Sequence, residues 1–163
     1  MMKKILLIAA MVLGFAVAAD AQGWRVGARV GSGFQAQGEW SYNGADYVEA
    51  RFGMGWYHGG LTADFTALHN WNICTMDWTP SVGQWFVDAG AGLTIGGRAN
   101  FVNLGVAGCA KLGLEFNDAP IRLSLDWTPA FGPAIVYVPG WGSGAVFNEY
   151  GLANLGISAV FCF

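Results

Sequence analysis

The segment IRLSLDWT, residues 121–128, alternates apolar and polar side chains without an exception. The alternation divides it into two faces, Ile121, Leu123, Leu125 and Trp127 against Arg122, Ser124, Asp126 and Thr128. A period of two places successive side chains on opposite sides of a β-strand, whereas an amphipathic helix repeats every three to four residues. The segment therefore predicts a β-strand with one apolar and one polar face.

The same alternation recurs along most of the chain and predicts eight strands. We expect them at residues 24–34, 47–56, 60–69, 73–79, 84–95, 101–116, 121–128 and 150–163. The alternation changes phase around residues 68–72, which we interpret as a tight turn between the third and fourth strands. The fourth strand is short, so six or ten strands are the alternatives to eight.

Charged side chains fall on the polar faces of these strands and on none of the apolar faces. The polar faces carry Arg25, Arg29, Glu49, Arg51, Asp64, Asp77, Asp88, Lys111, Glu115, Arg122 and Asp126. In a membrane barrel the apolar faces point to lipid and the polar faces point into the lumen. We therefore expect these eleven residues to form a charge network in the lumen. The other charged residues of the exported chain, Glu39 and Asp46 among them, fall at strand ends, turns or loops.

The composition agrees with a protein that meets lipid. Charged residues make up 12% of the chain and hydrophobic residues 54%, and 25 of the 163 residues are glycine. A soluble domain typically has about 25% charged residues. Beyond residue 21 no apolar run is long enough for a membrane helix, which needs about 20 residues. Backbone groups in lipid must be paired internally, so a closed barrel is the alternative.

The first 21 residues have the pattern of a secretory signal peptide. Lys3 and Lys4 precede an apolar segment, and Ala19-Asp20-Ala21 has the small-x-small form of a cleavage site. We expect cleavage before Gln22 and a barrel domain over residues 22–163. The exported chain keeps a small negative net charge, which gives no reason to expect nucleic-acid binding.

The expected connections differ in length between the two ends of the barrel. Residues 35–46 and 129–149 are expected to be long extracellular loops, and residues 57–59, 80–83 and 117–120 short periplasmic turns. Aromatic residues cluster near the expected strand ends, as in the girdles of membrane barrels. They are Trp24, Trp40, Trp56, Tyr57, Trp71, Trp78, Trp85 and Trp127.

The end of the chain carries a family resemblance. Phe163 is preceded by apolar residues at every second position, including Ile157 and Phe161, with Tyr150 further upstream. This pattern resembles the C-terminal signal that the barrel-assembly machinery reads in outer-membrane barrels. With LSLDWTPAF at residues 123–131, the chain resembles the small eight-stranded outer-membrane proteins of Gram-negative bacteria, which include the membrane domain of outer membrane protein A. The resemblance implies an up-and-down transmembrane barrel in the outer membrane, surrounded by its lipid.

The function expected from these features is non-catalytic. Ion pairs are expected to fill the narrow lumen, so the role is structural or lies in surface contacts made by the extracellular loops. A narrow solute channel is the first alternative, and a lipid-modifying enzyme using His69 at the outer rim, with Ser143 or Asp77, is the second. A soluble barrel with its apolar faces inward is the third. Three cysteines without metal-ligand spacing give no reason to expect a cofactor or a metal site.

Overall fold

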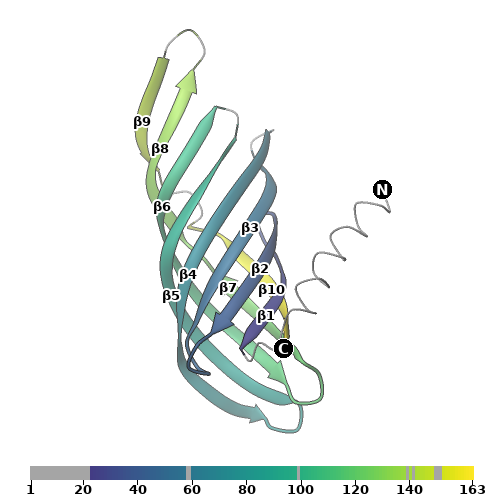
Figure 1. Ribbon diagram of the computed structural model, residues 1–163. Helices are drawn as coiled ribbons and strands as arrows, with labels where there is room; N and C mark the ends of the chain where they lie inside the picture. Colours follow the sequence, from purple (N-terminus) through teal and green to yellow (C-terminus); the bar gives the residue numbers. More distant parts are fainter. Residues whose placement is uncertain (1–22, 58–59, 99, 139, 141, 149–151) are drawn as a thin grey trace, which may run out of the picture.

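The computed structural model describes residues 23–57, 60–98, 100–138, 140, 142–148 and 152–163, and these residues form an all-β structure (Figure 1). Its ten strands are β1 (Trp24–Val30), β2 (Phe34–Ser41), β3 (Tyr47–Tyr57), β4 (Gly60–Thr79), β5 (Gly83–Arg98), β6 (Phe101–Phe116), β7 (Ile121–Trp127), β8 (Ala130–Val138), β9 (Gly142–Asn148) and β10 (Leu155–Cys162). The expected signal peptide, residues 1–21, and Tyr150 lie outside the described residues. None of the described residues forms a helix long and apolar enough to cross a membrane.

The sheet closes into an eight-stranded antiparallel barrel. Neighbouring strands pair in chain order from β1 to β7, and β10 pairs with both β7 and β1. We call the end where β1 begins and β10 finishes the terminal end, and the opposite end the distal end. The prediction of an all-β antiparallel barrel with eight strands is confirmed, although two of its strands were placed wrongly.

The seventh and eighth positions around the barrel are each shared by two strands. β7 pairs with Ala110–Glu115 of β6, and β8 pairs further along β6, with residues from Phe101 to Ala107. Pro129 separates β7 from β8, as expected for a residue that cannot donate to a sheet ladder. β9 pairs with β8, and the chain then returns as β10 beside β7. The prediction of a single loop over residues 129–149 was therefore wrong, because most of that segment is the β8–β9 hairpin.

The phase change near residue 70 has a different cause from the one expected. β4 runs without a turn for 20 residues. A β-bulge interrupts its pairing with β5 between Asn72 and Cys74. A bulge inserts one extra residue and so exchanges the inner and outer faces of the strand beyond it. The prediction of two strands at residues 60–69 and 73–79 was wrong, and one bulged strand explains the same pattern.

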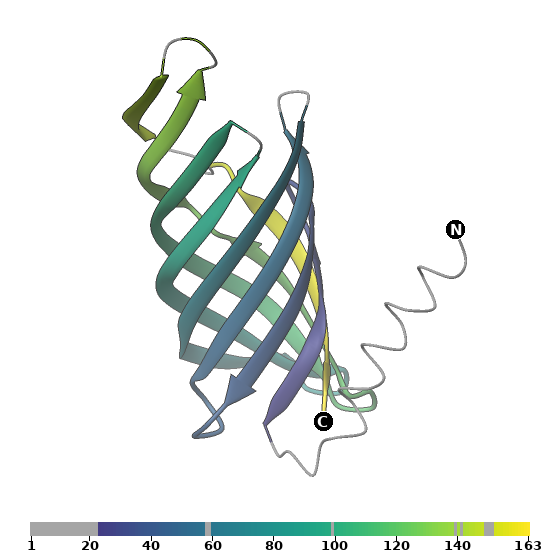
Figure 2. The same cartoon turned by 45° about the horizontal axis from the view of Figure 1, so that its top comes forward.

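The expected loop at residues 35–46 is mostly a strand. β2 pairs with β1 along seven positions and with β3 along eight. Because of this strand, β3 ends and β4 begins at the distal end of the barrel rather than at the terminal end (Figure 2). The predicted total of eight strands is thus correct because two errors cancel: the prediction missed β2 and counted β4 as two strands.

Inward-facing glycines allow the sheet to coil tightly enough to close. A Cβ atom at Gly92 would collide with the backbone of Ala67 and Leu68 on β4, and one at Gly27 would collide with the backbone of β10. Eight strands make a narrow barrel whose inner wall leaves little space for side chains. Glycine is therefore required at these positions by close approach of neighbouring strands.

Candidate functional site

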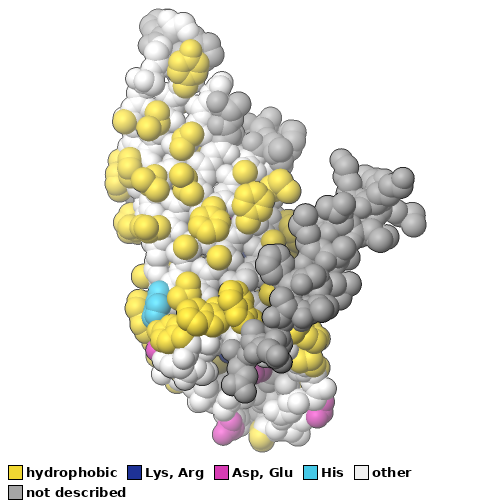
Figure 3. Space-filling view, in the orientation of Figure 1, with side chains coloured by type: hydrophobic (Ala, Val, Ile, Leu, Met, Phe, Trp, Pro, Cys, Tyr) yellow, Lys and Arg dark blue, Asp and Glu magenta, His cyan; other side chains and the backbone are white. Residues whose placement is uncertain are grey.

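The distribution of side chains between the inside and the outside of this barrel is the reverse of that in a soluble domain. The largest fully buried side chains include Arg29, Arg51, Glu39, Glu49 and Asp126. Tryptophan, phenylalanine, leucine and isoleucine side chains cover much of the outer wall (Figure 3). Charged residues are almost never fully buried in soluble proteins unless they are paired. The buried charges of the barrel interior, called the charged cluster below, are thus its most distinctive feature.

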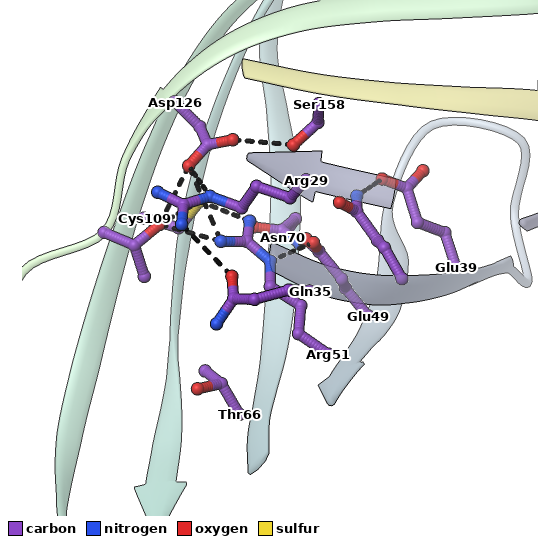
Figure 4. Close-up of polar contacts among 12 residues, drawn as sticks. Arg29, Gln35, Glu39, Glu49, Arg51, Thr66, Asn70, Cys109, Asp126 and Ser158 are labelled. Carbon is purple, nitrogen blue, oxygen red and sulfur yellow. Dashed lines mark hydrogen bonds and ion pairs between the residues drawn. The ribbon is translucent and has the colours of Figure 1, made fainter. Parts of the chain in front are cut away.

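Arg29 and Asp126 form the centre of the charged cluster (Figure 4). Both side chains are fully buried, and Arg29 Nε donates to Asp126 Oδ1 at 2.6 Å. Arg29 Nη1 also donates to Gln35 Oε1 at 3.1 Å, and Ser158 Oγ donates to Asp126 Oδ2 at 2.7 Å. These contacts join β1, β2, β7 and β10, so the cluster ties the two ends of the chain together across the seam that closes the barrel.

A second series of ion pairs continues toward the terminal end. Arg51 pairs with Glu49 on its own strand and lies 3.5 Å from Asp126. Lys111 Nζ bridges two carboxylates, at 2.8 Å from Glu49 Oε2 and 3.1 Å from Glu39 Oε1. These pairs span the lumen from β3 to β6 and to β2. Charges that are buried in this way must be paired, because an unpaired buried charge is costly.

Three cationic side chains lie over the ring of Tyr47 near the terminal end. Its ring lies 5.4 Å from the Arg25 guanidinium, 5.1 Å from Lys111 Nζ and 5.2 Å from the Arg122 guanidinium. Its hydroxyl donates to Asp88 Oδ2 at 2.8 Å, and Asp88 also pairs with Arg122. Cations over an aromatic face are attracted to it, more strongly where water is excluded. The Tyr47 ring therefore lies among three positive side chains, each of which also pairs with a carboxylate: Arg25 with Glu39, Lys111 with Glu49 and Arg122 with Asp88.

The predicted lumen residues divide into three groups. Eight of them take part in buried or partly buried ion pairs: Arg25, Arg29, Glu49, Arg51, Asp88, Lys111, Arg122 and Asp126. Asp64 is half-buried and accepts from Gln35 Nε2 at 2.6 Å. Asp77 and Glu115 are exposed, because both lie where β4 and β6 extend toward the terminal mouth.

Glu39 is a member of the cluster that the sequence interpretation missed. It is 2% exposed and pairs with both Lys111 and Arg25. It was assigned to a loop because the outward positions of β2 include Ala36 and Gly38, which make a weak apolar pattern. The alternation of Gln35, Gln37 and Glu39 with those small residues was the signal that could have found it.

Beyond the charged cluster, small and apolar side chains fill the interior. Leu68 on β4 packs in one buried group with Ala107 and Cys109 on β6 and Ala130 on β8. Ala134 is fully buried, and the Thr66 and Thr94 hydroxyls lie 2.9 Å apart. Most of these side chains are short, and they come from the successive strands β4, β5, β6 and β8. We call Thr66, Leu68, Thr94, Ala107, Ala130 and Ala134 the small-residue wall.

A row of aromatic side chains lies on the outer wall near the terminal end. Trp24, Trp40, Tyr42, His69 and Trp71 follow one another with ring centroids 4.6–6.3 Å apart. His69 was expected at an outer rim, where it could serve catalysis. It lies instead within this row, hydrogen-bonded to the Tyr42 hydroxyl at 2.7 Å. Ser143 is in β9 at the distal end and Asp77 is near the terminal end, so the structure does not bring these candidates together.

Other kinds of site find little support among the described residues. These residues contain no group of three or more histidine, cysteine, aspartate or glutamate side chains placed to hold a metal ion. A shallow hollow of about 440 Å³ opens on the outer wall near the distal end, and Phe52, Phe65, Ile95 and Val102 contribute to its lining. Its surface is mostly apolar and continues that of the outer wall.

Comparisons with known proteins add no family to this description. No protein-family model matches the chain, and no curated protein or solved structure shows significant similarity to it. Strand pairing and burial define the class: an antiparallel eight-stranded β-barrel with a buried ion-pair network in its interior.

Proposed function

We propose that the protein is a non-catalytic barrel of the bacterial outer membrane, with its lumen closed by ion pairs. The observation that carries the proposal is the reversed distribution of side chains. Fully buried Arg29, Glu49 and Arg51 lie opposite an outer wall that exposes Phe52, Leu125 and Ile157. Exposure of so much contiguous apolar surface to water would favour aggregation. Lipid removes this cost, and the closed sheet leaves no unpaired edge within the barrel wall.

The aromatic row supports a membrane boundary near the terminal end. Trp24, Trp40 and Trp71 are each 44% exposed on the outer wall. Amphipathic rings favour the level of the lipid headgroups, where the apolar ring and the polar N–H group both find suitable surroundings. The row then marks one boundary, and the apolar wall from this row toward the distal end is the part that meets the hydrocarbon.

An outer-membrane location is supported by two features of the sequence. Residues 1–21 have the pattern of an export signal, and the chain ends in the alternating pattern of Ile157, Phe161 and Phe163. All three side chains lie on the exposed face of β10 or directly after it. The barrel-assembly machinery is therefore the partner proposed for insertion.

The closed interior supports a structural role over transport. The charged cluster and the small-residue wall occupy successive levels of the lumen. Ion pairs such as Lys111–Glu49 span the first level, and buried side chains such as Leu68 and Ala107 pack in the second. A role in structure or in surface contacts follows, with the β8–β9 hairpin presented at the distal end.

Membrane fractionation combined with heat-modifiability tests the location and the fold together. We expect the protein in the outer-membrane fraction, with an electrophoretic mobility that shifts only after boiling. A soluble periplasmic protein without such a shift would contradict the proposal. Stable single-channel openings in a planar bilayer would instead overturn the closed lumen and favour the channel.

A further inference from the structure

The β8–β9 hairpin projects beyond the rest of the barrel at the distal end (Figures 1 and 2). Residues 130–148, which include the hairpin, contain no charged side chain. Every described side chain from residue 142 to residue 147 is exposed. An uncharged hairpin with one fully exposed strand is unusual at the end of a barrel, where polar side chains normally meet water.

β9 leaves one edge of the sheet open. Among the described residues it pairs with β8 alone, through seven positions from Gly142 to Asn148. An open edge presents a row of unpaired N–H and C=O groups, which readily pair with another strand. Natural edges are usually protected by lysine, proline or a bulge. β9 has the sequence GSGAVFN and contains none of these.

Both faces of the hairpin are apolar as well. Phe147 is 73% exposed and Tyr137 is 53% exposed on the face that continues the outer wall. Val146 is 49% exposed on the opposite face, level with Ala134 of β8. A partner that pairs with the edge would therefore also cover apolar side chains.

We propose that β9 pairs with β9 of a second copy of this chain, in antiparallel orientation, to form a symmetric dimer. A two-fold interface places the same surface of each copy against the other. Antiparallel pairing over the whole strand puts Ala145 opposite its own copy, so a charge there would meet an identical charge. Like charges directly opposite each other destabilise a sheet. A strand without charges and with small central residues therefore suits pairing with itself.

The test is the oligomeric state of the full-length protein in detergent and in lipid vesicles. We expect a dimer in the wild type, measured by analytical ultracentrifugation and by single-molecule photobleaching. Ala145→Lys places two positive charges together at the interface, and the dimer is lost. The matched control is Ile135→Lys, because Ile135 lies directly across from Ala145 but on β8, one strand away from the open edge. This variant keeps the dimer.

Restoration by the opposite charge distinguishes pairing from damage to the hairpin. Mixing Ala145→Lys with Ala145→Glu protein restores the dimer as a heterodimer, while each variant alone is monomeric. Heat-modifiability shows that each variant keeps its barrel. A monomeric wild type, or a dimer that survives both Ala145 substitutions, would overturn the inference. A monomer found in the outer membrane would contradict the dimer and leave the proposed function intact. A dimer found outside the membrane would contradict the proposed function and leave the dimer intact.

Discussion

Two parts of the barrel interior are filled in opposite ways. In the charged cluster, long side chains such as Arg51 and Lys111 cross the lumen to reach carboxylates on other strands. In the small-residue wall, short side chains such as Ala107 and Ala134 are buried on the neighbouring strands β6 and β8. The stability of the charged cluster depends on completing every ion pair, and the stability of the small-residue wall depends on filling its volume. Substitutions in the two parts should therefore destabilise the barrel for different reasons.

The largest effect is expected from removing one buried carboxylate from the charged cluster. Glu49→Gln leaves Arg51 and Lys111 with too little negative charge, and breaking a buried pair costs about 3–5 kcal/mol of unfolding free energy. Urea titration of the vesicle-embedded protein, followed by tryptophan fluorescence, measures the loss. The double substitution Glu49→Gln with Lys111→Met restores the charge balance and should be less destabilised than Glu49→Gln alone. A double variant that is as unstable as the sum of its two single variants would contradict this account.

Removing volume from the small-residue wall comes next. Leu68 is 2% exposed and is the bulkiest member of its group. Leu68→Ala leaves a cavity between β4 and β6, and large-to-small substitutions of buried leucine cost about 2–5 kcal/mol. The same urea titration applies. Leu125→Ala is the control, because Leu125 is 54% exposed on the outer wall. An equal loss of unfolding free energy in Leu68→Ala and Leu125→Ala would show that the small-residue wall is not tightly packed.

A smaller effect is expected where a glycine supports the charged cluster. A Cβ atom at Gly156 would lie 2.5 Å from the Arg29 Cζ atom. Gly156→Ala therefore pushes the Arg29 guanidinium away from Asp126, at a cost of about 1–3 kcal/mol, as for other overpacked sites. Gly38→Ala is the control, because no atom lies within 4 Å of its Cβ position. If both variants had the same urea midpoint, Gly156 would have no role in positioning Arg29.

The smallest effect is expected at the exposed members of the predicted charge network. Asp77→Asn should change the unfolding free energy by less than about 0.5 kcal/mol, as is usual for surface substitutions. Asp88→Asn, by contrast, weakens the contacts with Arg122, Tyr47 and Asn72. Comparing the two in one titration shows how far the cluster extends toward the terminal mouth. A large loss for Asp77→Asn would extend it to the end of β4.

Much of the side-chain orientation could be predicted from the alternation alone. The expected inner and outer faces of residues 121–128 agree with their burial, with Arg122, Ser124, Asp126 and Thr128 buried. Alternation reports the direction of a side chain whenever one face is apolar and the other is charged. The same signal therefore identified most members of the charged cluster.

The strand boundaries were harder to predict, for three physical reasons. β2 alternates polar residues with Ala36 and Gly38, which carry almost no apolar signal. The bulge in β4 changes the phase as a turn would. In the segment of β8 and β9, Pro129, Pro133 and Pro139 suggest a loop, although Pro133 lies within β8. Pairing with the neighbouring strands, which the alternation within one segment does not contain, determines each of these elements.

The pairing of β1 with β10 has a consequence for the time course of folding. Arg29 contacts Asp126, 97 positions further along the chain, and β10 supplies the last strand of the wall. Until β10 pairs with them, β1 and β7 each leave an open edge. Arg29 then lacks its acceptor Asn154, and Asp126 lacks its donor Ser158. Contacts between such distant positions make closure slow, since a long loop must be ordered before they form. The nascent chain therefore needs protection from other strands until its synthesis is complete.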